Sequence, residues 1–255
     1  MRKKGEDKKG NSKKTWGLVV YILLLTVWAF CSVVVSQLVV GIIMSLFVDA
    51  ETLNTPLFSG LYSFLSYGLA LLLLVLVPPK VAEKWKKEKQ KSAETSREEL
   101  GLSSFPTWTD IGLAPVAFIV STLLAIGLVQ LFSVFPWFNS AQEQATGFSP
   151  FMSYGDKIIA FLVLVVAAPI VEEIIFRGWL YGKLRARLNA VASILIVSVL
   201  FGIMHFQWNV GVNVFALSVV CCVLREITGT IYAGILTHMI KNGVAFYLLY
   251  VLGFG

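Results

Sequence analysis

The sequence predicts an all-α, polytopic integral membrane protein with about seven transmembrane helices, within a range of six to eight. Two observations carry this prediction. The chain is 57% hydrophobic and only 14% charged, with a mean hydropathy of +0.78, whereas a soluble domain of this length carries far more charge. Apolar runs of about eighteen residues or more also recur along the chain, and each is long enough to cross a bilayer as a helix.

The basic residues indicate an orientation rather than a nucleic-acid partner. The net charge is +6, but the basic residues flank the apolar runs and do not gather on one amphipathic face. Residues 1–15 carry seven Lys or Arg and are predicted to be a disordered basic tail, which the positive-inside rule places in the cytoplasm. We therefore expect a multi-pass protein of the plasma membrane, with the lipid bilayer as a partner, no nucleic acid, and no specified oligomeric state.

The region 16–154 is predicted to hold the N-terminal transmembrane spans. Its first apolar run is too long for a signal peptide and has no small-residue cleavage pattern, so we expect it to be retained. A mixed-charge segment is predicted to be a cytoplasmic loop that includes a solvated helix, whereas the other links lack basic residues and suit the outer side. The predicted spans are 16–48, 57–77 and 111–135, the cytoplasmic loop is 79–110, and the outer links are 49–56 and 136–156.

The region 155–255 is predicted to be a catalytic membrane core, with its site buried between the C-terminal helices. Four spans alternate across the bilayer and leave the C-terminus outside. Dividing the long first span, or breaking the last span at Lys241, would give eight. The predicted spans are 157–176, 190–206, 214–224 and 229–252, and an outer turn is expected over 207–213.

A cluster of ionisable residues in this core predicts a functional site. Glu172, Glu173 and Arg177 close a long apolar run, and an ionisable group there costs about 2.5–3.5 kcal/mol on insertion scales, so a functional role with a polar partner is the default interpretation. His205 and His238 are the only two histidines of the chain, and both lie in apolar segments. Asn242 follows His238 by one helical turn.

Depth and direction allow these groups to converge. At 1.5 Å per residue, Glu172 and His238 lie roughly 15 Å from the inner ends of their helices, and His205 roughly 24 Å, a difference that tilt or a kink at Pro169 could reduce. Glu173 and Arg177 are one turn apart and are expected to pair, which leaves Glu172 as the freer carboxylate.

These residue types suit hydrolysis of an amide by water. Glu172 is expected to act as general base, His205 to hold the water or exchange a proton, and His238 with Asn242 to stabilise the oxyanion. Zinc held by Glu172, His205 and His238 is the alternative, although no H-E-x-x-H spacing supports a metal, and we favour a metal-free mechanism. No G-x-S-x-G motif is present, and the three cysteines suggest neither a nucleophile nor a disulfide framework.

Three motifs in order resemble a known family. They are E-E-x-x-x-R at Glu172–Arg177, F-x-x-x-H at Phe201–His205 and H-x-x-x-N at His238–Asn242, and the stretch Arg225–Ile231 fits as well. Together they resemble the CPBP family of CAAX-protease-like and bacteriocin-processing membrane proteins, also called the type II CAAX prenyl endopeptidase or Abi family. The resemblance covers about residues 155–250.

The resemblance implies an intramembrane endopeptidase in which the first glutamate activates water. Its substrate would be a membrane-associated peptide or protein, either a prenylated CAAX tail or a pheromone or bacteriocin leader, and the compact chain looks bacterial. A non-catalytic scaffold or bacteriocin self-immunity protein on the same fold is the main alternative. A proton-coupled transporter is a third class, but transporters usually contain internal repeats and the sequence shows none.

Overall fold

In the part that the structure describes, all regular secondary structure of the chain is helical. In this computed structural model the described residues are 3–83, 95–142, 147–149 and 151–253. The predicted all-α class is confirmed. The elements are α1 (Lys3–Phe47), α2 (Ala50–Leu53), α3 (Pro56–Glu83), α5 (Arg97–Leu100), α6 (Trp108–Phe132), α7 (Tyr154–Phe161), η1 (Leu162–Ala167), α8 (Ala168–Glu173), η2 (Ile174–Leu180), α9 (Tyr181–Arg185), α10 (Ala190–Ile203), α11 (Trp208–Thr228), α12 (Tyr232–Phe246) and η3 (Tyr247–Val251), where η marks a π-helix.

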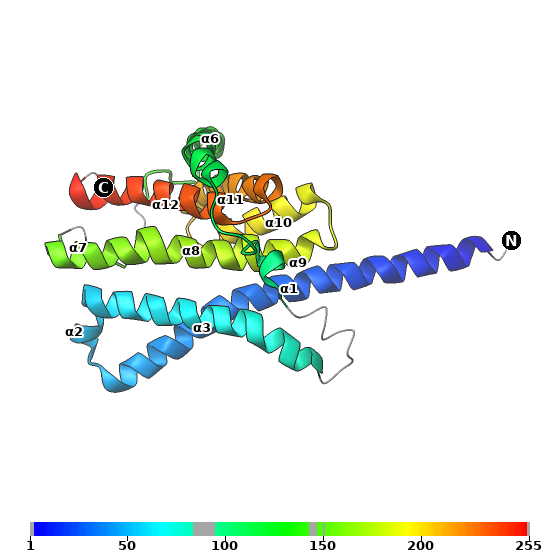
Figure 1. Cartoon of the computed structure of the whole chain (residues 1–255), viewed down its shortest axis with the longest axis horizontal. Coiled ribbons are helices and arrows are strands. Elements are labelled where there is room, and N and C mark those ends of the chain that lie inside the picture. Colours follow the sequence, from blue (N-terminus) through cyan, green and yellow to red (C-terminus); the bar gives the residue numbers. More distant parts are fainter. Residues whose placement is uncertain (1–2, 84–94, 143–146, 150, 254–255) are drawn as a thin grey trace.

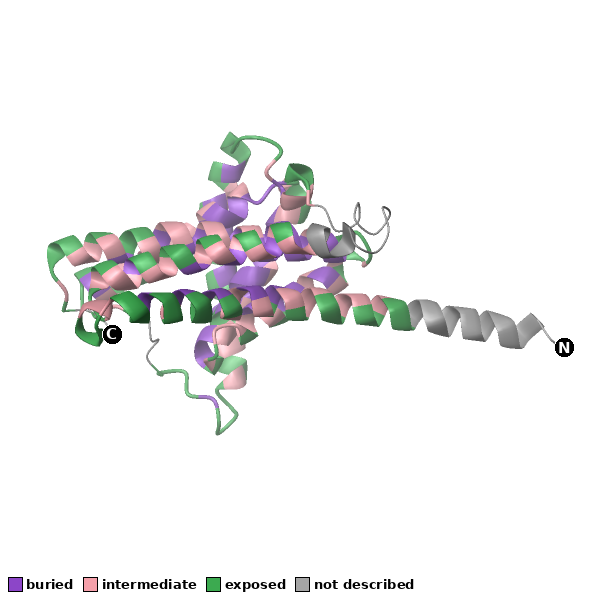
Figure 2. Cartoon of the chain, turned by 90° about the horizontal axis from the view of Figure 1, so that it is seen from below, coloured by how far each residue is buried: buried purple, intermediate pink, exposed green. Residues whose placement is uncertain are grey.

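The helices have the length and polarity of membrane spans. Five are long and apolar enough to cross a membrane, namely Trp16–Phe47, Pro56–Pro78, Trp108–Phe132, Tyr154–Arg185 and Trp208–Thr228. The helix α10 is apolar but shorter, with 14 residues, and α12 with η3 corresponds to the last predicted span. Large apolar side chains are exposed along these helices, as a surface that faces lipid requires (Figure 2). The chain is therefore a polytopic membrane protein.

The helices form an N-terminal pair beside a C-terminal group (Figure 1). The helices α1 and α3 are antiparallel and lie along the continuous helix that runs from α7 to α9. The helix α6 is seen nearly end-on in the same view, so it crosses this long helix steeply, and it packs on α11 and α12.

One hydrophobic core joins the two halves of the chain. Its buried members come from α1, α3, η2, α9, α10 and α11, and they include Ala29, Ala70, Leu74, Trp179, Leu180, Phe201 and Val214. The side chains of Leu74, Trp179 and Phe201 are at most 1% exposed. The packing of this core is therefore continuous across residue 154, where the sequence predicts the boundary between the N-terminal spans and the catalytic core.

The helix Tyr154–Arg185 carries two π-helical segments, η1 and η2, on either side of α8. Pro169 is the second residue after the end of η1. A proline within a helix lacks a donor and collides with the carbonyl four residues earlier, and the wider π turn before it makes room for the ring. At Pro169, where a kink could reduce the difference in depth, the structure shows this change in helical winding.

The short helix α5 packs against η2 and α9. A Cβ atom at Gly178 would lie 3.0 Å from the Leu100 carbonyl oxygen, and one at Gly182 would lie 2.8 Å from that of Glu99. Gly178 and Gly182 form a G-x-x-x-G motif, and the element that packs closely against it is α5 rather than a second long helix. Lys183 Nζ also pairs with Glu99 Oε1 at 3.0 Å.

One predicted segment near the N-terminus differs in the structure, and another, in the middle of the chain, falls largely outside the described residues. The helix α1 begins at Lys3, so residues 3–15 are helical where the composition predicts a disordered tail; residues 1–2 lie outside the described residues. Lys and Glu are good helix formers, and the long apolar helix that follows provides the nucleus they extend. The solvated helix predicted within 79–110 falls largely on residues 84–94, which are also outside the described residues.

The predicted outer turn over 207–213 is wrong, because α11 already begins at Trp208. The polar residues Asn209 and Asn213 suggest a turn, but each has a partner within the fold. Asn209 Nδ2 donates to the Gln142 carbonyl, far away in the sequence, at 2.6 Å, and Asn213 Nδ2 donates to the Asn209 carbonyl, one turn along the helix, at 2.8 Å. At its other end α11 stops at Gly229, whose φ of +72° is the left-handed conformation that glycine adopts readily. The helix α12 continues through Lys241 without a break.

Candidate functional site

The two adjacent carboxylates lie on opposite edges of one imidazole ring. His238 Nδ1 is 3.1 Å from Glu173 Oε1, and His238 Nε2 is 3.8 Å from Glu172 Oε2. Side chains at consecutive helix positions point about 100° apart, which predicts that only one can face a given point. Here they meet different atoms of the same ring, so both carboxylates contact His238.

Arg177 stabilises the inner carboxylate. Its Nη1 lies 3.0 Å from Glu173 Oε1, and both side chains are fully buried. The pairing expected from the sequence is present, one turn along the helix. The guanidinium also lies 4.4 Å from the centroid of the Phe201 ring, an arrangement that favours a buried cation. One oxygen, Glu173 Oε1, therefore forms an ion pair with Arg177 and a hydrogen bond with His238.

The second oxygen of Glu173 lies against the backbone of α12. A Cβ atom at Gly234 would be 2.9 Å from Glu173 Oε2, and among the described residues Oε2 has no hydrogen-bond partner. Only glycine at this position lets α12 approach the carboxylate so closely. Gly234 lies one turn before His238 on the same helix face, so the same i, i+4 spacing that identifies Asn242 could have identified it.

Glu172 is the freer carboxylate, as the pairing of Glu173 predicts. Its side chain is 22% exposed, whereas that of Glu173 is 0% exposed. Tyr67 of α3 and Lys241 of α12 are close enough to interact electrostatically with Glu172. Tyr67 is not predicted for the site from the sequence, because nothing in the order of the motifs indicates that α3 lies beside it. Lys241 lies next to Asn242 in the sequence and is not assigned a role in the site from the sequence.

His205 lies in the turn between α10 and α11 rather than inside a span. Its Nδ1 is 2.8 Å from the Phe201 carbonyl oxygen; because a carbonyl only accepts, Nδ1 carries a proton and Nε2 of the neutral ring has the free lone pair. The Phe201 ring lies between the two histidines, 5.0 Å from His205 and 5.9 Å from His238. Phe206, which follows, has a φ of +52°, an unusual conformation for a bulky residue.

Asn242 connects α12 to the π-helix η1. Its Nδ2 donates to the Leu164 carbonyl oxygen at 2.9 Å, and a π-helical segment commonly leaves a carbonyl available for such a contact. An amide nitrogen has two hydrogens, so one remains to donate elsewhere. The structure thus gathers Glu172, Glu173, Arg177 and His238 in direct contact, with His205 and Asn242 beside them.

The alternative zinc site was tested against the donor atoms. Two imidazole Nε2 atoms and one carboxylate are suitable ligands by type. Among the described residues, however, no three His, Cys, Asp or Glu side chains are grouped closely enough to hold a metal. The side chains of Glu172, His205 and His238 are therefore not grouped as three ligands of one metal in this arrangement.

Comparison with known proteins bears on residues 154–244. This segment matches the family model described as "Type II CAAX prenyl endopeptidase Rce1-like". No curated protein and no solved structure matches the chain. The matched segment includes η1, η2 and all six candidate site residues. Residues 154–244 of this chain are therefore similar to the type II CAAX prenyl endopeptidase Rce1-like family, which is consistent with the resemblance that the three motifs indicate.

Proposed function

We propose that the chain is an intramembrane endopeptidase that hydrolyses a peptide bond with water activated by Glu172. The observation that carries the proposal is the contact of one imidazole with two carboxylates in different states: Glu173 is buried and paired with Arg177, and Glu172 is partly exposed. Two neighbouring carboxylates in different environments suit different roles.

In the proposed reaction Glu172 takes a proton from water, and the hydroxide attacks the peptide carbonyl carbon. The 3.8 Å separation between Glu172 Oε2 and His238 Nε2 is too long for a direct hydrogen bond, and a water or substrate oxygen can contact both atoms. The free Nε2 of His205 is suited to hold that water. Glu172 then returns the proton to the leaving nitrogen as the C–N bond breaks.

The tetrahedral oxyanion would be stabilised by His238 and Asn242. To donate from Nε2, His238 must carry protons on both ring nitrogens, since Nδ1–H already donates to Glu173. The Glu173 carboxylate stabilises this imidazolium. The second hydrogen of Asn242 Nδ2 is the other donor.

The substrate is proposed to be a membrane-associated peptide or protein, either a CAAX-like tail or a pheromone or bacteriocin leader. We also propose that the protein resides in the plasma membrane of a bacterium with its N-terminus in the cytoplasm. The basic inner segments support that orientation.

The test compares wild type with Glu172→Gln in liposomes, using a mixed panel of prenylated and leader-type peptides with cleavage read by mass spectrometry. Glu51→Gln, an exposed carboxylate in α2, is the matched control. The proposal is supported if wild type and Glu51→Gln cleave a peptide in the presence of a chelator and Glu172→Gln does not. Cleavage that requires added zinc would replace the metal-free mechanism. A cellular phenotype unchanged by Glu172→Gln would favour a scaffold or self-immunity protein.

A further inference from the structure

We propose that the α1 face around Gln37 is the surface through which two copies of this chain associate in the membrane. Gln37 lies within the apolar helix segment Trp16–Phe47, ten residues before its end. Ten residues correspond to about 15 Å, half of a hydrocarbon core of about 30 Å. Its side chain is exposed, so with Phe47 at the end of the hydrocarbon core this amide would face lipid near the middle of the bilayer.

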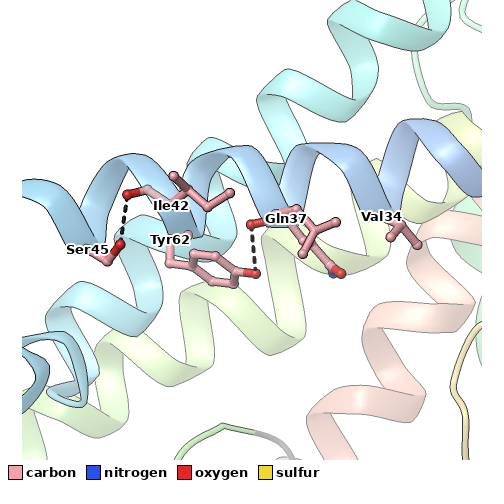
Figure 3. A pocket seen from close by; sticks show the side chains of 7 residues that line it. Val34, Gln37, Ile42, Ser45 and Tyr62 are labelled. Atoms are coloured by element: carbon pink, nitrogen blue, oxygen red, sulfur yellow. Dashed lines mark hydrogen bonds between the residues drawn. The ribbon is translucent and has the colours of Figure 1, made fainter.

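Gln37 lines a shallow groove on α1 of about 430 Å³ (Figure 3). Most of its wall is apolar and comes from α1, with Tyr62 of α3 contributing from the side. Leu38 and Ile42 in this wall are 59% and 60% exposed. The lining residues are Val34, Gln37, Leu38, Gly41, Ile42, Ser45 and Tyr62.

The Gln37 amide is the polar group of this groove that has no partner. The Tyr62 hydroxyl donates to the main-chain carbonyl of Gln37 at 3.3 Å, and the Ser45 hydroxyl donates to that of Ile42 at 2.8 Å. The side-chain amide of Gln37 makes no hydrogen bond to any described residue. An unsatisfied amide in hydrocarbon costs several kcal/mol, so this face requires a partner that supplies both a donor and an acceptor.

A second copy of the chain meets this requirement best. An amide is both donor and acceptor, so two glutamine side chains can satisfy each other reciprocally. A two-fold axis along the membrane normal places Gln37 of both copies at the same depth and in a parallel arrangement. Symmetry brings a second amide to the depth of Gln37 only when the partner is another copy of the chain. It does not do so for an unrelated helix or a lipid chain. Polar side chains of this kind stabilise helix association in membranes.

The test measures energy transfer between donor- and acceptor-tagged copies of the full chain in phosphatidylcholine vesicles over a series of protein-to-lipid ratios. We expect saturable association for wild type, and Gln37→Leu should weaken it about threefold to tenfold. Gly41→Leu should weaken it as well, because the larger side chain fills the groove. Since Tyr62 binds the main chain of Gln37, Gln37→Leu leaves the contact of α1 with α3 intact.

Ile43→Leu is the matched control, because Ile43 is 51% exposed and lies about 240° around the helix from Gln37. It should associate like wild type. Equal association of Gln37→Leu and wild type, or wild-type transfer no greater than that of randomly distributed molecules, would overturn the proposal. Loss of substrate cleavage in Gln37→Leu with unchanged association would assign the groove to another occupant and would also overturn it.

Discussion

Glu173 is the residue on which the arrangement of the site depends most directly. One of its oxygens contacts both Arg177 and His238, and the other lies against Gly234. A buried ion pair gains little net stability over an apolar pair, but removing one partner leaves a charge buried alone. The residues around Glu173 are therefore expected to show strong effects in stability as well as in activity.

Arg177→Met should lower the free energy of unfolding by about 3–5 kcal/mol, because the Glu173 carboxylate loses its buried counter-ion. Adding Glu173→Gln should restore part of the loss, and equilibrium unfolding in detergent measures both. Arg185→Met is the control. Arg185→Met breaks the ion pair with Glu226, in which the two side chains are 43% and 33% exposed. It should lower the free energy of unfolding by about 0–1 kcal/mol. Equal costs for Arg177→Met and Arg185→Met would contradict the prediction.

Gly234→Ala should lower peptidase activity about tenfold to a hundredfold without changing any charged group. The new methyl group would meet Glu173 Oε2 at 2.9 Å and displace the carboxylate that orients His238; misplacement of about 1 Å can cost this much. Gly243→Ala, on the same helix, would meet only Val165 Cγ1 at 3.6 Å and should keep wild-type activity. Cleavage rates of both variants on one peptide decide the matter, and an active Gly234→Ala enzyme would refute this role.

At the level of elements, the site depends on the winding of one helix and on what packs against it. The segments η1 and η2 flank the two glutamates, and each has an external contact. Asn242 binds the Leu164 carbonyl of η1, and α5 packs on Gly178 of η2. A change in either contact should therefore shift the helix backbone and, with it, the positions of the Glu172 and Glu173 carboxylates.

Gly182→Val should separate α5 from α9, because even a Cβ atom there lies 2.8 Å from the Glu99 carbonyl oxygen. We expect a loss of about 1–3 kcal/mol and faster amide exchange over residues 95–101, measured by mass spectrometry. Gly112→Val on α6, where no atom lies within 4 Å, controls for the substitution itself. Unchanged exchange over 95–101 in Gly182→Val would show that α5 is held by other contacts.

At the scale of the whole molecule, the N-terminal helices are part of the same core as the site. Ala70 and Leu74 of α3 pack with Trp179 and Leu180 of η2, and α6 covers α11 and α12. Asp110 near the start of α6 also accepts a hydrogen bond from Thr230 at 3.2 Å, which ties α6 to the segment before α12. The segment that matches the family is thus packed against helices outside it.

Residues 147–255 expressed alone should therefore be inactive and protease-sensitive, whereas co-expression with residues 1–146 should restore cleavage. The reason is that the isolated segment would expose core faces of η2, α11 and α12 that α1, α3 and α6 cover. Activity assays and limited proteolysis of membranes from both strains provide the measurement. A stable, active 147–255 fragment would show that the N-terminal helices are dispensable for the site.

The sequence by itself determined the membrane class, the helical composition and the identity of the candidate residues. These follow from local properties: apolar runs long enough to span a bilayer, and ionisable residues placed where they are costly. The Glu173–Arg177 pair could be predicted because one helical turn separates the two. The outer turn over 207–213 was mispredicted because polar side chains in α11 find partners that lie far away or one turn along, which composition does not indicate.

Only the tertiary structure decided how the site is assembled. The contact of both glutamates with one imidazole, the approach of Gly234 to Glu173, the position of His205 in a turn and the neighbourhood of Tyr67 each join residues from different helices. Such contacts depend on the inclination of the helices and on π-helical winding. Both result from packing of side chains across the core rather than from the pattern along one helix.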